Sequence, residues 1–246
     1  TITGASSFTT TTANDDITLD QVNLFTGAVS LATNGATGNI SVTNVGAALN
    51  LGTITTTLTG TLAIETNTGS ITDSGVTTAS GTSSYAITVA GDDITLDQIS
   101  TYTGAITITA AGAGSDVSIT NANLDVDLGT TTVGGNLVIE TDNNSITDSG
   151  VLTITGTSTF TTTEAAGDIT LDQISSFTGA VSLNTAAGAG NDASLINAAI
   201  ALDLGASTVG GTYTIETNAG SIIDSGVLTI TGASSFTTTT ANDDIT

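Results

Sequence analysis

The chain has 246 residues and contains no Lys, Arg, His, Pro, Cys, Met or Trp, while its 23 acidic residues give a net charge of −23. Without a basic side chain the protein cannot neutralise phosphates, which excludes nucleic acids and anionic membrane surfaces as partners. No apolar run approaches the length of about 18 residues that a membrane-spanning helix requires, so we expect no membrane insertion.

One acidic motif organises the chain from its beginning. The motif DDITLDQ at 15–21 returns at 92–98, returns as GDITLDQ at 167–173, and begins again at residue 243. Its second Asp recurs at intervals of 77, 75 and 76 residues. A fixed period of this size indicates a tandem repeat architecture. We expect one continuous array with repeats at about 1–75, 76–150 and 151–226, and the start of a further repeat at 227–246.

The two ends of the sequence are related. Residues 229–246 are identical to residues 1–18. This identity predicts a window on a longer array, which would continue with Leu-Asp-Gln after Thr246. Duplicated ends are the alternative.

Each repeat divides into smaller units, clearest at 151–173, 174–197 and 198–226, with lengths of 23, 24 and 29 residues. Every unit reads as an alternating strand, a small turn, and a short strand that ends at a corner residue. Asn and Gly tolerate positive φ, so a left-handed backbone is expected at those corners. Aromatic residues recur at fixed phases and are expected to stack inside. The corner residues are Gln21, Gln98 and Gln173, then Asn44, Asn121 and Asn197, then Gly75, Gly150 and Gly226.

These units predict an all-β fold, a parallel β-solenoid with about 25 residues per coil and three coils per 76-residue repeat. Coils would stack at roughly 4.8 Å, the spacing of hydrogen-bonded strands. Ile169 should then lie beside a residue near Ala193. A tandem array of immunoglobulin-like sandwiches is the alternative. The inner units and the absence of Pro favour the solenoid, because interior coils need every backbone N–H.

The segment VGGNLVIET at 133–141, followed by a Gly-x-Ile pattern and a short turn, resembles the repeats of filamentous-haemagglutinin-like bacterial surface proteins. The resemblance covers nearly the whole chain as a matter of pattern and composition. It implies a right-handed β-helix that is exported to the cell surface and forms a rod for adhesion or matrix.

Acidic side chains offer the only reactive chemistry. Equivalent carboxylates three coils apart would be separated by roughly 14 Å along the rod, too far for a catalytic pair. No His, Lys, Arg or Cys is present to act as base, nucleophile or anion clamp. We therefore expect no enzymatic activity.

Calcium is a candidate ligand, because clustered Asp and turn carbonyls supply the hard oxygen atoms that it prefers. The segment GAGNDASL at 188–195 distantly resembles the calcium-binding nonapeptide of RTX proteins, but it occurs once per repeat and not in tandem. Solvated turns are the alternative interpretation. The candidate calcium ligands are Asp15, Asp16, Asp92, Asp93, Asp116 and Asp192.

Thr-rich solenoids can also bind ice through two flat ranks of Thr. If Phe160, Leu183 and Tyr213 are equivalent, one outward rank reads Thr, Asn, Thr and the other reads Thr, Ala, Glu. Neither rank is uniform, so we interpret the Thr residues as strand formers on an exposed sheet.

Together these features predict a structural segment of a long extracellular bacterial filament at the cell surface or in the matrix. Rods of high negative charge would stay apart, and salt or divalent cations would let them self-associate into filaments or bundles. The alternative is the stalk of a surface adhesin whose binding tip, for a surface polysaccharide or a cell receptor, lies outside this stretch.

Overall fold

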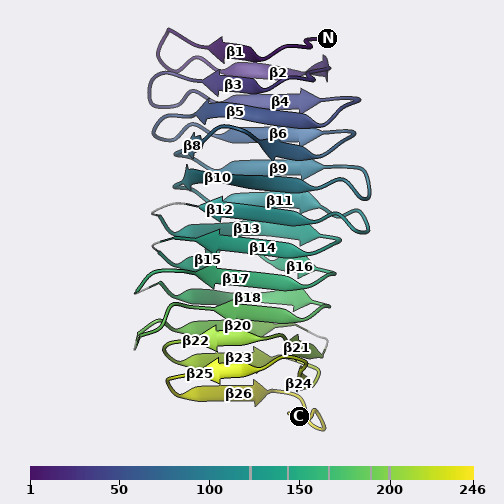
Figure 1. Cartoon of the computed structure of the whole chain (residues 1–246), viewed down its shortest axis with the longest axis vertical. Helices are drawn as coiled ribbons and strands as arrows, with labels where there is room; N and C mark the ends of the chain where they lie inside the picture. The colour runs from purple at the N-terminus through teal and green to yellow at the C-terminus, as the bar shows by residue number, and fades with distance from the viewer. Residues whose placement is uncertain (122–123, 143, 166, 189, 199–200) are drawn as a thin grey trace.

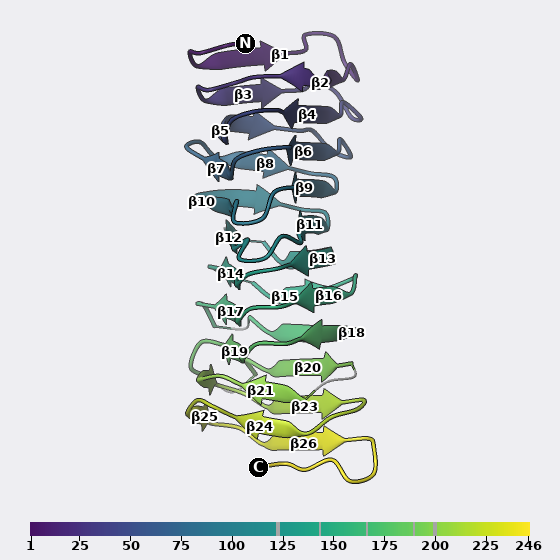
Figure 2. The same cartoon turned by 90° about the vertical axis from the view of Figure 1, so that its right-hand side faces the viewer.

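The computed structural model describes residues 1–121, 124–142, 144–165, 167–188, 190–198 and 201–246. Within these ranges the chain forms 26 β-strands and no helix, and the strands pair in parallel. Figures 1 and 2 show the strands stacked along one axis as a rod, with the two termini at opposite ends. The predicted parallel β-solenoid is confirmed. The immunoglobulin-like alternative, which requires antiparallel sheets, is wrong.

The strands form two sheets, and consecutive strands mostly alternate between them. Sheet 1 has 14 strands: β1 (Ser6–Thr9), β3 (Val29–Ala32), β5 (Leu49–Thr55), β7 (Ile71–Asp73), β8 (Thr77–Ala79), β10 (Ile94–Tyr102), β12 (Val117–Asn121), β14 (Leu137–Thr141), β17 (Ser158–Thr162), β19 (Val181–Asn184), β21 (Leu202–Leu204), β22 (Ser207–Val209), β24 (Ile222–Asp224) and β25 (Leu228–Ile230). Sheet 2 has 12 strands: β2 (Ile17–Asn23), β4 (Ile40–Asn44), β6 (Leu62–Thr66), β9 (Ser83–Ile87), β11 (Ile106–Ala110), β13 (Val126–Val133), β15 (Ile146–Asp148), β16 (Leu152–Ile154), β18 (Ile169–Phe177), β20 (Ala193–Asn197), β23 (Tyr213–Thr217) and β26 (Ser234–Thr238).

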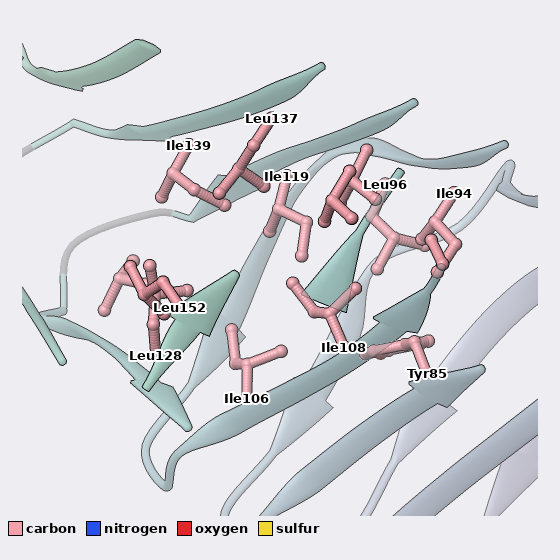
Figure 3. Packing of buried hydrophobic residues seen from close by; sticks show 14 of the residues in the cluster. Tyr85, Ile94, Leu96, Ile106, Ile108, Ile119, Leu128, Leu137, Ile139 and Leu152 are labelled. Carbon is pink, nitrogen blue, oxygen red and sulfur yellow. The ribbon is translucent and has the colours of Figure 1, made fainter. Parts of the chain in front are cut away.

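The core lies between the two sheets. Apolar residues alternate with Thr and Ser along each strand, so one set of side chains points inward. In β12, Val117 and Ile119 are buried while Ser118 and Thr120 are partly exposed. Figure 3 shows Leu96 and Ile119 of sheet 1 pointing toward Ile106 and Ile108 of sheet 2. The narrow core therefore continues along the rod as one cluster.

Successive coils place residues 20 to 24 positions apart beside each other, as in the pairs Val117 with Leu137 and Ile169 with Ala193. The predicted neighbourhood of Ile169 and Ala193 is thereby confirmed. A coil holds roughly 22 residues. The value of about 25 predicted from the sequence is too large.

Each coil contributes one stretch of strand to each of the two sheets. We call each of these stretches, which lies along one side of the core, a pass. A long pass holds two buried segments separated by a bulge. In β10, Leu96 and Ser100 are buried on either side of Asp97, Gln98 and Ile99, and the register to the neighbouring strand shifts there. A short pass holds one strand of four or five residues, such as β12.

Each repeat contains seven passes, so the same motif falls on alternate sheets. Ile17 begins β2 in sheet 2, Ile94 begins β10 in sheet 1, and Ile169 begins β18 in sheet 2. Ile245 then forms a bridge with Ile222 in sheet 1. Along sheet 2 the order β2-β4-β6-β9-β11-β13-β15-β18 takes seven steps, so two repeats make seven coils. One repeat is therefore three and a half coils, and the predicted three coils per repeat is wrong.

The error lies in the last unit of the repeat, 198–226, which was interpreted as one coil. It holds two whole passes, β21 with β22 in sheet 1 and β23 in sheet 2, and the first half of a third, β24 in sheet 1. β24 has only three residues, so the sequence pattern alone does not indicate that a new pass begins there. The unit's 29 residues are therefore more than one coil of roughly 22 residues.

Buried amides mark the Asn corners. Asn44, Asn121 and Asn197 end short strands and are fully buried, and none of them has a positive φ. Oδ1 of Asn121 accepts the backbone N–H of Tyr102 at 3.2 Å, and its Nδ2 donates to the carbonyl oxygen of Leu124 at 3.1 Å. The side chain thus supplies backbone partners beside the bulge of the adjacent long pass. The predicted left-handed Asn corner is wrong.

The corner glycines Gly75, Gly150 and Gly226 lie in the bulges of long passes and also lack positive φ. A Cβ on Gly150 would lie 2.2 Å from the backbone nitrogen of Thr130, and a Cβ on Gly226 would lie 2.0 Å from that of Ala206. Glycine is needed there because neighbouring coils approach closely, and not for its left-handed freedom.

Three pairs of aromatic rings meet across the core, each joining a short pass to a long pass of the opposite sheet. The rings meet edge to face with centroids 6.0 to 6.2 Å apart, an arrangement that aromatic side chains favour. The predicted interior placement is confirmed. These pairs are Phe8 with Phe25, Tyr85 with Tyr102, and Phe160 with Phe177.

Candidate functional site at the acidic corners

An acidic or amide side chain occupies the corner just before the strand in successive coils of sheet 1. Oδ1 of Asp93 accepts the backbone N–H of Asp116 at 2.9 Å, and Oδ1 of Asp116 accepts the backbone N–H of Asn136 at 2.7 Å. Oδ1 of Asn136 continues the series to the backbone N–H of Thr157 at 2.9 Å. We call this series the corner ladder. It supplies partners for the N–H groups at the points where the strands begin.

Sheet 2 has the same arrangement. Oδ1 of Asp168 accepts the backbone N–H of Asp192 at 2.8 Å, and Oδ1 of Asp192 accepts that of Thr212 at 2.7 Å. Oδ1 of Asp16 accepts the backbone N–H of Asn39 at 2.7 Å. Four of the six candidate calcium ligands, Asp16, Asp93, Asp116 and Asp192, therefore accept the backbone N–H just before a strand of the next coil.

The remaining two candidates lie beside the ladder. Asp15 is exposed in a turn, and Oδ2 of Asp92 accepts the backbone N–H of Gly69 at 2.7 Å. Among the residues that the structure describes, no three His, Cys, Asp or Glu side chains gather closely enough to hold a metal ion. Asp93 and Asp116 are brought into adjacent coils, but each already uses a carboxylate oxygen on a backbone N–H. Calcium binding by these residues stays a prediction.

A second acidic set supports the bulges of the long passes. Oδ1 of Asp148 accepts the backbone N–H groups of Asp172 at 2.8 Å and Gln173 at 3.3 Å. Asp73 holds the equivalent bulge of β10 in the same way, at 3.0 and 3.4 Å. We call Asp73 and Asp148 the bulge carboxylates.

Burial raises the pKa of both bulge carboxylates from 3.8 to about 6. The backbone N–H groups that they accept lower the pKa, and the negative charge of Asp97 or Asp172 in the next coil raises it further. Burial outweighs the hydrogen bonds. These two groups therefore take up a proton close to neutral pH.

The bulge of β10, which Asp73 supports, lies near two buried hydroxyls. Oη of Tyr85 and Oη of Tyr102 are 2.8 Å apart, within hydrogen-bond distance. Burial raises the pKa of Tyr102 to about 12 and the pKa of Tyr85 well above its usual 10. Both phenols are therefore neutral at ordinary pH, and the pair is a structural contact.

The sequence singled out the acids around DITLDQ but not Asp73 or Asp148. A signal for them exists, because Ile-Thr-Asp-Ser-Gly recurs at 71–75 and 146–150. The segment does not by itself indicate a buried carboxylate, because Asp before Ser-Gly is typical of an ordinary turn. Its burial depends on the bulge of the next coil, which lies about 24 positions further along the chain.

The Thr ranks differ from those proposed for ice binding. Phe160 does pair with Leu183 in sheet 1, but Tyr213 lies in sheet 2, beside Ala193. The supposed equivalence across these three residues is wrong, because the chain makes one and a half coils between Leu183 and Tyr213.

An apolar hollow of about 230 Å³ at the C-terminal end of the rod is lined mainly by core side chains, among them Leu204, Ile222 and Phe236. No helix in the described part of the chain is long and apolar enough to cross a membrane.

Comparison with known proteins identifies a repeat family. Residues 1–32, 37–109, 114–184 and 190–246 match the family described as repeats of unknown function (DUF5649). The chain belongs to this family. The stretches of this chain that match DUF5649 begin at residues 37, 114 and 190, so they follow the same period as the acidic motif. No curated protein and no solved structure matches the chain.

Proposed function

We propose that this DUF5649 chain is a structural segment of a long extracellular bacterial fibre, a rod at the cell surface or in the matrix. The observation that carries the proposal is the unbroken strand order. In each sheet eleven strands follow one another by direct pairing from one end of the described chain to the other. Stacks of this kind extend by adding coils, because each repeat contacts only its neighbours.

The hydrogen bonds of the rod run along its axis. Backbone pairing joins every coil to the next, and the corner ladder adds side-chain acceptors in the same direction. Tension along the rod would therefore load many hydrogen bonds at once. This arrangement suits a stiff spacer better than a ligand-binding domain.

The charge supports a rod that stays separate from its neighbours in dilute salt. The net charge is −23 with no basic side chain, so two rods repel each other until salt screens them. Association into filaments or bundles would then depend on ionic strength or divalent cations.

The resemblance to filamentous-haemagglutinin-like proteins adds export to the cell surface and adhesion to this proposal. A stalk is the second candidate function. All eight aromatic side chains lie in the core or pack against it, so none stands free on the surface to stack on a sugar. A surface polysaccharide or a cell receptor would then be bound by another part of the parent protein.

Electron microscopy of proteins with two, four and six repeats tests the rod. The length should grow by about 17 Å per repeat, from three and a half strand spacings of about 4.8 Å. Immunogold labelling of intact host cells should place the protein outside the cell. Compact particles whose length does not follow repeat number, or label found only after the cells are opened, would contradict the proposal.

A further inference from the structure

One turn of the first repeat contains a chemically labile pair of residues. Asn34 and Gly35 lie between β3 and β4, where Asn34 is exposed and Gly35 is partly exposed. Asn followed directly by Gly occurs nowhere else in the sequence. Asn is a thermolabile residue, because the backbone nitrogen of the next residue can attack its side-chain amide. A following Gly has no side chain to shield that nitrogen.

The other two repeats show that the fold does not need this Asn. The turn after β11 has Ala111 and Gly112 at the same distance from its strand. The turn after β19 is one residue longer and has Ala187 and Gly188. The Gly is therefore common to all three repeats, whereas the Asn is a departure from the repeat pattern.

The preceding coil explains why position 35 requires Gly. Gly35 has a φ of +91°, and a Cβ there would lie 2.5 Å from the backbone nitrogen of Asn14. Oδ1 of Asn14 accepts the backbone N–H groups of Ala36 at 2.7 Å and Thr37 at 3.1 Å, which holds the two turns together. Any other residue at position 35 would be strained and crowded. The labile pair can therefore be removed only by a change at Asn34.

Both reacting groups of the pair are free. Within the described residues the backbone N–H of Gly35 donates no hydrogen bond, and Oδ1 of Asn34 accepts none. Nδ2 of Asn34 makes a single hydrogen bond of 3.2 Å, to the carbonyl oxygen of the exposed Thr11. The side chain can therefore turn toward the nitrogen of Gly35 at the cost of one solvent-accessible hydrogen bond.

We propose that Asn34 is a site of spontaneous deamidation. The backbone nitrogen of Gly35 forms a bond to Cγ of Asn34, the Cγ–Nδ2 bond breaks, and the side-chain nitrogen leaves as ammonia with the proton of the Gly35 amide. Water then opens the resulting succinimide ring at one of its two carbonyl groups, which gives either Asp or isoaspartate at position 34. The reaction does not depend on the proposed function as a fibre.

The products change the turn in two ways. Either product adds one negative charge beside the turn that leads into Asp15 and Asp16. Isoaspartate also lengthens the main chain by one carbon atom. The carbonyl oxygen of Asn34 accepts the backbone N–H of Asn14 at 2.7 Å, and this lengthening displaces it. The first repeat should therefore become more acidic and more loosely joined at this turn as the protein ages.

Ageing of the folded 246-residue chain at neutral and at mildly alkaline pH tests this inference. Chymotrypsin is the protease of choice, since the chain has no Lys or Arg for trypsin, and mass spectrometry of the peptides locates each converted residue. Asn34 should lose its amide steadily, and faster at alkaline pH, because the attacking nitrogen must give up its proton. Asn67, which is exposed and followed by Thr68, should keep its amide over the same period.

The variant N34A is the matched control, because it carries the residue of the other two repeats. It should melt at the same temperature as the natural chain and form no additional acidic band on isoelectric focusing, whereas the natural chain should form one. Two results would overturn the inference. One is a folded chain that keeps Asn34 while the urea-unfolded chain loses it, which would show that the turn protects the pair. The other is equal loss at Asn34 and Asn67.

Discussion

The aromatic pairs of the second and third repeats occupy the same place in the fold on opposite sheets. Tyr85 and Tyr102 meet edge to face at 6.2 Å and 85°, and Phe160 and Phe177 meet at 6.2 Å and 90°. The tyrosines share a buried hydroxyl contact that the phenylalanines lack. The coil therefore sets the ring geometry, and the hydroxyls fit into it. The same environment returns on the opposite sheet three and a half coils later, which shows that the two sheets play equivalent parts.

The largest loss of stability is expected at the buried Asn beside each aromatic pair, Asn121 and Asn197, where the two environments are most alike. Asn121→Leu should destabilise the protein by about 3 kcal/mol, because it leaves the buried N–H of Tyr102 and the carbonyl of Leu124 without this partner. Asn197→Leu should cost about the same on the opposite sheet. Thermal and urea unfolding measure both. Asn67→Ala, at an exposed turn, is the control and should change stability by less than about 0.5 kcal/mol. Unequal losses at the two buried sites would show that the sheets are not equivalent.

Removing one or both hydroxyls of the tyrosine pair tests whether the two aromatic pairs are equivalent. Tyr85→Phe or Tyr102→Phe alone should cost about 1–2 kcal/mol, because one buried hydroxyl loses its partner. The double variant reproduces the Phe160 and Phe177 pair, so it should recover most of that loss. A double-mutant cycle measures the coupling. If the two single losses simply add, the hydroxyl contact contributes nothing to stability.

The bulge carboxylates predict an unusual response to pH. Their pKa is about 6 in the folded protein, against 3.8 ordinarily, so the folded form binds protons more tightly than the unfolded chain. Their contribution to stability is complete below about pH 3.8 and is lost as the pH rises through about 6. The melting temperature should therefore rise between about pH 7 and pH 5. The double variant D73N and D148N should show a shallower rise, and an unchanged slope would contradict this role.

The smallest effect is expected from calcium at the acidic corners of both sheets. Adjacent carboxylates lie closer than the Debye length of about 8 Å, so screening by Na⁺ relieves their repulsion only in part. Millimolar Ca²⁺ should raise the melting temperature slightly more than Na⁺ at equal ionic strength, by mass action on the folded form. A melting series in Ca²⁺, Na⁺ and chelator measures the difference. Three coinciding curves would leave the corners with their backbone role alone.

The sequence was sufficient for the solenoid, its interior residues and the adjacency of Ile169 and Ala193, because alternation and fixed spacing are local signals. It was not sufficient for the coil count. The three-residue strand Ile222–Asp224 forms a separate pass only because Leu202–Leu204 of the preceding coil pairs with it. The hydrogen bonds that the corner acids accept could not be predicted from the sequence for a similar reason. That Asp93 accepts from Asp116 depends on which residue lies one coil away, and the repeat period alone does not show this.

Engineered disulfides test the half-coil offset most directly, since the chain has no cysteine of its own. Adjacent parallel strands place Cα atoms about 4.8 Å apart, within the range that a disulfide spans. Under mild oxidation, S194C with T214C should form a cross-link because these residues pair in sheet 2. N184C with T214C should not, because Asn184 lies in sheet 1 beside Thr161 and Thr208. T161C with N184C is the positive control. A cross-link between positions 184 and 214, with none between 194 and 214, would show that each repeat makes three whole coils. It would contradict the half-coil offset that moves the motif from one sheet to the other.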